Sequence, residues 1–137
     1  MTPLSLCRYV AAIANDGKMM APRDHISDSV SVHKQIMNKE EARILQDCMK
    51  AQSAGRFGSH IGGKTGTPSR TDRTKATGQS NDALYCFFVD AAGTPSEHPL
   101  AVVIRLERVN DYSRIAMQMA NDVVLPVLRE KGYIIKD

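Results

Sequence analysis

Two almost continuous apolar runs, Leu84–Val89 and Leu100–Leu106, constrain the fold of this chain more than any other feature. A strand without alternation of apolar and polar residues is typical of a sheet that is covered on both faces. The turn-rich segment Gly93-Thr94-Pro95 between the runs is short enough to join them as an antiparallel hairpin. With a third strand predicted over residues 60–67, we expect a three-stranded antiparallel sheet packed with helices, which is an α+β fold.

The first of the covering helices is predicted at the start of the chain. Thr2 can cap a helix whose first position is Pro3, and the segment Asn15-Asp16-Gly17 is expected to end it. Residues 18–37 lack a helical period, so they are predicted to be loop with one short strand.

Two further helices are predicted later in the chain. Glu41 stands three residues after Asn38, as in a capping box, so a second helix is expected to start there and to end at Gly55. The last helix is predicted to follow Asp111, which can serve as its N-cap. Pro126 is expected to bend that helix, because its ring removes one backbone donor.

The composition excludes several classes of protein. The 137 residues suffice for one domain, and the hydrophobic fraction of 42% with a charged fraction of 24% indicates a packed core. A net charge of +3 is too small to predict binding to nucleic acid or to an anionic membrane. No apolar run approaches the roughly 20 residues that span a bilayer, and no export signal is recognisable.

The cysteines and histidines do not point to a metal or a disulfide. Cys7, Cys48 and Cys86 are odd in number and widely spaced, so neither a disulfide framework nor a zinc site is predicted. We expect all three to be small core residues on helices and a strand. The histidines lack metal-ligand spacing, and His60, like the others, is assigned no role. No metal and no organic cofactor is expected.

The segment Ser69 to Asp82 differs from the rest of the chain. It contains Arg70, Arg73 and Lys75 among Thr, Ser, Gly and Gln residues, without apolar periodicity. It is therefore predicted to be a long polar loop. Two interpretations stay open: a solvated connection, or a basic rim beside a site for an anionic ligand.

The residues best suited to bind a ligand are Gly62-Gly63-Lys64-Thr65-Gly66-Thr67. The glycines expose the backbone, while the hydroxyls and the ammonium group can donate hydrogen bonds to a carboxylate or a phosphate. Together with Gly58 the segment matches the phosphate-loop pattern Gly-x4-Gly-Lys-Thr. A phosphate loop needs a buried strand before it and a helix that starts at the Lys-Thr. Neither is predicted here, so nucleotide binding is the least favoured interpretation.

Several motifs in a fixed order make a resemblance visible over nearly the whole chain. Residues 2–17, Thr-Pro-Leu-Ser-Leu-Cys-Arg-Tyr-Val-Ala-Ala-Ile-Ala-Asn-Asp-Gly, resemble the helix that follows the Gly-Gln-Gly turn in bacterial penicillin-binding proteins. Gly63-Lys64-Thr65-Gly66-Thr67-Pro68, then Asn81-Asp82-Ala83 before an aromatic strand, and then Pro99 to Ile104 follow as in that family. The chain thus resembles the C-terminal part of a serine D,D-transpeptidase domain, in the β-lactamase-like superfamily.

The resemblance implies roles for individual residues. In that family the Lys-Thr-Gly strand borders the active site, and the substrate peptide lies alongside it as an added strand. Lys64, Thr65 and Thr67 would bind the terminal carboxylate of a D-Ala-D-Ala stem peptide or of a β-lactam. Gly66 would let the acyl group approach the backbone, and the backbone N–H of Thr67 would be one of two oxyanion-hole donors.

The family also needs a Ser-x-x-Lys, whose serine is acylated, and a Ser-x-Asn, both well before the Lys-Thr-Gly. Ser31-Val32-His33-Lys34 spells the first pattern, but it lies in a stretch with β-like alternation, so Ser31 is not expected to be the nucleophile. No Ser-x-Asn occurs. We expect residues 1–137 to be a C-terminal fragment of a single transpeptidase domain that lacks the nucleophile-bearing part and is inactive alone.

The parent protein would cross-link peptidoglycan by acyl transfer at the periplasmic, extracytoplasmic face of the inner membrane, and Met1 would occupy an internal position of it. Its partners would be the stem peptide or a β-lactam and the missing N-terminal half of the domain. Surfaces that this half normally covers would favour self-association of the fragment. The alternatives are a noncatalytic binding or scaffolding module derived from this fold and, less favoured, a nucleotide-binding protein.

Overall fold

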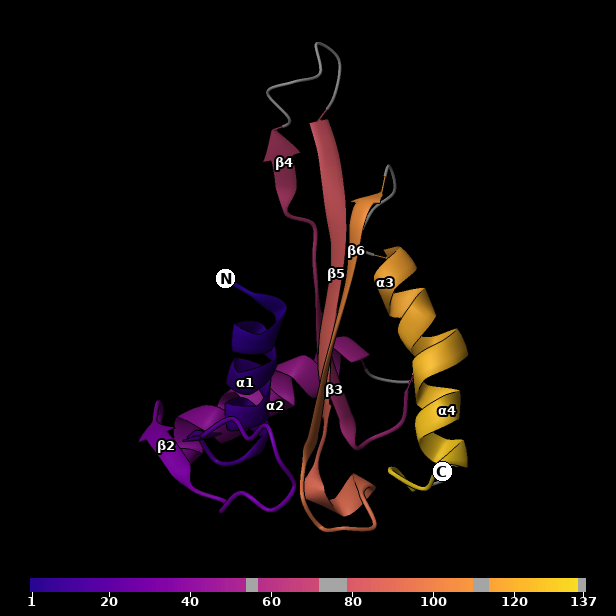
Figure 1. The fold of residues 1–137 in the computed structure, drawn as a ribbon. Coiled ribbons are helices and arrows are strands. Elements are labelled where there is room, and N and C mark those ends of the chain that lie inside the picture. The colour runs from indigo at the N-terminus through magenta and orange to yellow at the C-terminus, as the bar shows by residue number, and fades with distance from the viewer. Residues whose placement is uncertain (54–56, 72–78, 110–113, 136–137) are drawn as a thin grey trace.

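The computed structural model describes residues 1–53, 57–71, 79–109 and 114–135 (Figure 1). The elements follow in the order α1 (Pro3–Ala14), β1 (Lys18–Met20), β2 (Val32–Gln35), α2 (Lys39–Ser53), β3 (Ile61–Gly66), β4 (Ser69–Thr71), β5 (Gln79–Val89), the 3-10 turn η1 (Ala91–Gly93), β6 (Leu100–Val109), α3 (Arg114–Met119), the π-helical segment η2 (Ala120–Val124) and α4 (Leu125–Glu130).

A central antiparallel sheet is built around β5. On one edge β5 pairs with β3, from Ile61 opposite Val89 to Gly66 opposite Leu84. On its other edge it pairs with β6. The predicted three-stranded antiparallel sheet is confirmed, and the short strand β4 adds a fourth member that pairs with the first residues of β5.

The prediction of a polar loop over Ser69 to Asp82 is wrong at both of its ends. Ser69–Thr71 pair with Gln79, Ser80 and Asn81, so the hairpin between β4 and β5 extends the sheet past β3. Backbone pairing of short polar strands leaves no apolar pattern in a sequence, which is why the signal was missed. Arg73 and Lys75, which we expected to lie in that loop, are outside the described residues.

Helices cover both faces of the sheet, as the apolar runs predict. In Figure 1 the sheet is seen nearly edge-on, with α1 and α2 on one side and α3 and α4 on the other. Alternate side chains of β5 supply the two cores. Tyr85, Phe87 and Val89 belong to the cluster that α3, η2 and α4 complete, while Cys86 and Phe88 belong to the cluster with α1 and α2. Each half of the hydrophobic core therefore depends on the same strand.

The start and the end of α1 are as predicted. The Thr2 hydroxyl accepts a hydrogen bond from the N–H of Ser5, and Pro3 opens the helix. Asp16 and Gly17 have positive φ angles of 53° and 81°, which takes the chain out of the helix. A Cβ atom at Gly17 would lie 2.1 Å from the Met37 carbonyl oxygen, so no larger residue fits this turn.

Residues 18–37 contain two short strands rather than the predicted one. β1 and β2 pair antiparallel in a separate two-stranded sheet beside α1. All four side chains of β2 are exposed, so the pairing is stabilised by backbone hydrogen bonds. Because β2 has no buried face, the sequence shows no apolar pattern that would predict the strand.

The capping box of α2 is confirmed. The Asn38 side-chain oxygen accepts a hydrogen bond from the N–H of Glu41 at 2.9 Å, and the Glu41 carboxylate accepts one from the N–H of Asn38 at 2.8 Å. The expected stop at Gly55 lies outside the described residues.

The last helix is irregular directly before Pro126, the residue at which we predict a bend. Its expected cap, Asp111, lies outside the described residues. The helix widens over η2, where the N–H of Leu125 donates to the carbonyl of Ala120, five residues earlier. Pro126 follows at the second position of α4 and has no N–H to donate to the preceding turn. Within the described residues, no helix has the length and apolar character needed to cross a membrane.

The cysteines are placed differently from one another. Cys86 is buried and Cys7 is half-buried, as expected, and burial raises the pKa of both thiols. Cys48 is exposed on α2, so the prediction that it is a core residue is wrong. All three are free thiols.

Candidate functional site

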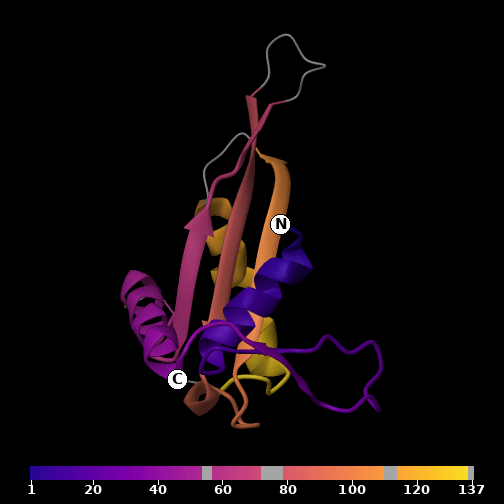
Figure 2. The same cartoon turned by 90° about the vertical axis from the view of Figure 1, so that its left-hand side faces the viewer.

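The two halves of β3 have different surroundings. Ile61, Gly62 and Gly63 are buried, Lys64 is exposed, and the strand ends half-buried at Gly66. Figure 2 shows β3 at the margin of the sheet with α2 alongside it. In the part of the chain that the structure describes, no strand pairs with the outer edge of β3.

Packing within the chain explains two of the three glycines. A Cβ atom at Gly62 would lie 2.5 Å from the Phe88 ring, and one at Gly63 would lie 2.2 Å from the Tyr85 hydroxyl. Both distances are far below van der Waals contact, so these positions require glycine. At Gly66 the nearest atom would be Leu84 Cδ2, at 3.4 Å. The fold itself therefore tolerates a side chain at Gly66.

Lys64 and Thr65 face opposite sides of the sheet, because successive side chains of a strand alternate. Lys64 lies opposite Cys86 in the β3–β5 register, and the Cys86 thiol donates a weak hydrogen bond to the Lys64 carbonyl at 3.5 Å. The Lys64 ammonium donates to the Thr65 carbonyl at 3.0 Å. Thr67 follows the strand and is exposed. The predicted site residues Lys64, Thr65, Gly66 and Thr67 thus share one strand edge but not one face.

A pocket of about 250 Å³ opens on the Thr65 side of β3. Its described lining comes from the end of α2, from β3 and β5, and from the start of α3, and consists of Gln52, Ser53, Gly63, Thr65, Tyr85, Arg114 and Met117. Sequence analysis did not find this pocket, because its residues come from four separate elements.

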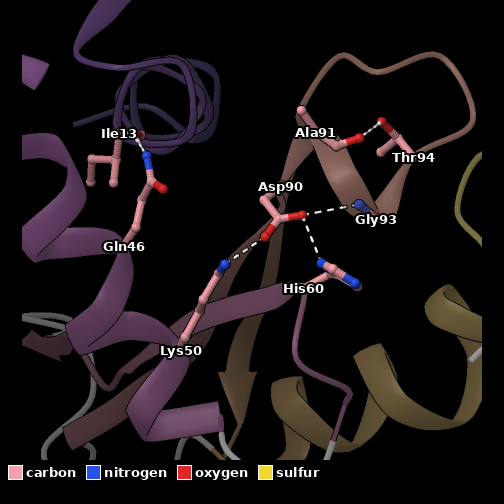
Figure 3. Close-up of polar contacts among 8 residues, drawn as sticks. All are labelled: Ile13, Gln46, Lys50, His60, Asp90, Ala91, Gly93 and Thr94. Atoms are coloured by element: carbon pink, nitrogen blue, oxygen red, sulfur yellow. Dashed lines mark hydrogen bonds and ion pairs between the residues drawn. The ribbon is translucent and has the colours of Figure 1, made fainter.

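A polar network at the opposite end of β3 was also missed (Figure 3). The Asp90 carboxylate, directly after β5, accepts a hydrogen bond from the Lys50 ammonium of α2 and lies 3.0 Å from the His60 ring nitrogen Nδ1. It also accepts the N–H of Gly93 at 3.0 Å. His60 directly precedes β3, so the network ties this strand to β5 and to α2. His60, to which the sequence analysis assigns no role, therefore has a structural contact in the fold.

The charge state of Asp90 reflects these contacts. Partial burial works to raise the pKa of its carboxyl group, but the hydrogen bond and the positive charge of Lys50, the N–H of Gly93 and the charge of His60 outweigh it. The pKa of Asp90 is therefore held below its ordinary value. A carboxylate at the end of a buried strand, three residues before a glycine, was the one signal in the sequence that could have indicated this capping role.

A second polar cluster fixes the far end of the β5–β6 pair. Asp82 is only 1% exposed, and its carboxylate accepts hydrogen bonds from Arg105 Nε and Nη2 at 3.1 and 2.7 Å. It also accepts the backbone N–H of Arg108, which has a positive φ angle of 56°. The strand register shifts between Asn81 and Ala83, so Asp82 stabilises an irregular stretch of the sheet.

The two alternative motifs do not have the geometry that their chemistry requires. Ser31 precedes β2 and Lys34 lies on it, so this pair is not on successive turns of a helix, and both are exposed. Lys64 and Thr65 lie within β3 and not at the start of a helix, so the nucleotide-binding alternative is wrong. Among the described residues no group of three or more His, Cys, Asp or Glu could hold a metal ion.

Comparison with known proteins gives one consistent result. Residues 1–125 match the family model described as the penicillin-binding protein transpeptidase domain. The chain is similar to three solved structures: PBPA from Mycobacterium tuberculosis (24% identity, TM-score 0.69, 93% of this chain and 32% of that one), penicillin-binding protein 2B from Streptococcus pneumoniae (20%, 0.71, 99% and 26%), and the apo TP domain of penicillin-binding protein 3 from Burkholderia pseudomallei (15%, 0.66, 96% and 43%). No curated protein matches the sequence.

The three structural matches cover nearly all of this chain but less than half of each similar protein. The chain spans 26% to 43% of the length of the three structures. At identities of 24% and below, the structural similarity establishes the fold and not the activity. The match of residues 1–125 to the family model is what assigns the sequence to a family.

Proposed function

The chain belongs to the penicillin-binding protein transpeptidase family, and we propose that β3 is the strand with which an intact D-Ala-D-Ala transpeptidase binds its substrate. The observation that carries this proposal is the contrast among the glycines. Gly62 and Gly63 are required by Phe88 and Tyr85, whereas nothing within the described chain requires Gly66. A backbone left bare without a packing reason is suited to close approach by a ligand.

Residues around Gly66 supply the groups for an anionic peptide. An extended peptide can add to the unpaired edge of β3 through main-chain hydrogen bonds. Lys64 offers an exposed ammonium group, and Thr65 and Thr67 offer hydroxyls, for a terminal carboxylate of a stem peptide or a β-lactam. The backbone N–H of Thr67 would be one of two donors to the oxyanion that forms when a serine attacks the peptide carbonyl.

The nucleophile of this reaction would come from the N-terminal half of the domain, outside these residues. In the intact protein that serine forms an ester with the D-Ala carbonyl, D-alanine leaves, and an amine of a second stem peptide accepts the acyl group. The reaction cross-links peptidoglycan at the extracytoplasmic face of the bacterial inner membrane. No Ser-x-Asn occurs in the chain and Ser31 is not on a helix, so we propose that the chain alone is inactive.

The proposed missing half also explains why apolar side chains are exposed here. Leu4 on α1, Ile26 and Val30 before β2, and Ile44 on α2 are exposed, Ile26 to 94%. We therefore expect the isolated chain to self-associate, because such surface is costly to leave in water. Sedimentation that shows a monomer at all concentrations would contradict this.

Titration of the ¹⁵N-labelled chain with a D-Ala-D-Ala stem peptide, followed by NMR, tests the proposal. The amide signals of Thr65, Gly66 and Thr67 should shift, and Lys64→Ala should reduce the affinity by about tenfold, as loss of a charge-assisted hydrogen bond does. Lys34→Ala is the matched control, since Lys34 is an exposed lysine on β2. Equal binding by both variants would contradict the role of Lys64.

Mass spectrometry after incubation with benzylpenicillin tests the proposed lack of a nucleophile. No covalent adduct is expected on the isolated chain. An adduct on Ser31, or on any other serine, would overturn that part of the proposal.

The coding DNA upstream of the Met1 codon distinguishes the fragment from a noncatalytic module. An open frame that encodes a Ser-x-x-Lys and a Ser-x-Asn would support the transpeptidase. A stop codon and ribosome-binding site directly before Met1 would favour a free-standing binding module instead.

A further inference from the structure

The pocket on the Thr65 side of β3 has a polar lining that the proposed substrate strand does not by itself explain. Of the described residues that line it, Arg114 alone is charged, and Ser53, Thr65 and Gln52 add two hydroxyls and an amide. Lys64 belongs to the other face of the strand and does not line the pocket. A ligand group that bonds to the Thr65 hydroxyl therefore has a different cation close by.

The charge of Arg114 has no partner among the residues that the structure describes. Within the described ranges its side chain forms no ion pair and no hydrogen bond, although other arginines of the chain do: Arg8 donates to Met20, and Arg105 is paired with Asp82. A guanidinium is a planar set of donors that fits a carboxylate in a bidentate manner. Arg114 is exposed at the rim of the pocket and can reach an anion that enters from solvent.

Ser53 provides a second observation on the same pocket. It is 3% exposed, and no hydrogen bond of its hydroxyl is present in the part of the chain that the structure describes. Its hydroxyl lines the pocket and can donate a hydrogen bond to an anion that enters it. Within the described ranges, the pocket thus combines a cation without a partner and the hydroxyls of Ser53 and Thr65.

We propose that Arg114 is a specificity-determining residue of the substrate site, which binds the free terminal carboxylate of the peptide through this pocket together with the Thr65 hydroxyl. The inference rests on the proposed function of β3 and adds Arg114, on the α3 side of the strand, to the groups proposed to bind the carboxylate. Arg114 makes the site selective for a free carboxylate over a neutral peptide terminus.

The test compares a D-Ala-D-Ala peptide with its C-terminal amide, which differs only in charge at that terminus. We expect the original chain to bind the acid about tenfold more tightly than the amide, the effect of one charge-assisted contact. Arg114→Gln should remove that preference, and Arg114→Lys, which keeps the charge but not the planar fork, should restore part of it. Arg43→Gln, at an exposed arginine of α2, is the matched control and should keep the preference. Circular dichroism checks that each variant is folded.

The outcomes separate this inference from the proposed function. If Arg114→Gln keeps the preference for the acid while Lys64→Ala loses it, the inference is overturned and the function of β3 stands. If neither peptide shifts the Thr65 signal in the original chain, the proposed function fails. Acetate is then the probe of the pocket alone: shifts at Thr65 and Ser53 that Arg114→Gln abolishes would retain an anion pocket without a substrate role, and their absence would end both proposals.

Discussion

The first half of β3 and its second half differ in what determines their residues. From Ile61 to Gly63 each position is buried, and the packing of Phe88, Tyr85 and Lys50 leaves room for nothing larger than glycine at two of them. From Lys64 to Thr67 the residues are exposed or half-buried, and no contact within the described chain demands their identity. The comparison teaches that a single Gly-rich segment can combine positions that packing determines with positions that packing leaves free, and the second group contains the residues that we propose bind a ligand.

The largest effect on stability is expected from a substitution in the buried first half of β3. Gly63→Ala should destabilise the chain by about 3 kcal/mol, because its Cβ atom would overlap the Tyr85 hydroxyl at 2.2 Å. Urea unfolding followed by circular dichroism measures this as a lower midpoint. An unchanged midpoint would show that the close packing of β3 against β5 is not a constraint, and the comparison between the two halves would fail.

Removing the polar network of Lys50, His60 and Asp90 should have an intermediate effect on the stability of the fold. Asp90→Ala removes the acceptor of Lys50, His60 and the Gly93 N–H, and we expect a loss of about 2 kcal/mol at neutral pH. If instead the loss is close to zero, the network is a surface contact and β3 is held by apolar packing alone.

The pH dependence of stability tests the same network independently. The pKa of Asp90 is lowered in the folded state, so its contribution is present at a pH above the unfolded-state value of about 4 and is lost as the pH falls through the lower folded value. The unfolding free energy of the original chain should decline over that acidic range more steeply than that of Asp90→Asn. Parallel curves for the two proteins would contradict the assignment.

The smallest effect on stability is expected in the second half of the strand. Gly66→Ala should change the unfolding free energy by less than about 0.5 kcal/mol, because its Cβ atom would meet only Leu84 at an ordinary contact distance. The same variant should abolish the peptide-induced shifts at Thr65 and Thr67. A variant that is equally stable and still binds would remove the reason for a glycine at this position.

Sequence predicted those parts of the fold whose causes are local. The caps of α1 and α2 were predictable, because Thr2 bonds to Ser5 and Asn38 exchanges hydrogen bonds with Glu41, three residues away in each case. The burial of β5 on both faces was also predictable from its unbroken apolar run. The strands β1 and β4 were not predicted, since three-residue strands are stabilised by partners elsewhere in the chain and have no pattern of their own.

The candidate site was predictable only in part for the same reason. Lys64 to Thr67 form one contiguous motif, so the sequence displays them together. The pocket beside Thr65 is lined by both Ser53 and Arg114. The polar network joins Asp90 to Lys50, 40 positions earlier, and to His60, 30 positions earlier. Contacts of this kind arise from the path of the chain in space and leave no spacing that a reader of the sequence could recognise.

The central position of β5 has a consequence for the timescale on which parts of the sheet open. β5 has partner strands on both edges and a hydrophobic cluster on each face, so we expect its amide protons between Tyr85 and Val89 to exchange with solvent only when the whole chain unfolds. On β3, every second amide points away from β5, toward an edge that no described strand covers. Those amides should exchange orders of magnitude faster than the amides of β5. The strand that we propose binds a ligand is therefore also one whose backbone is readily accessible to water.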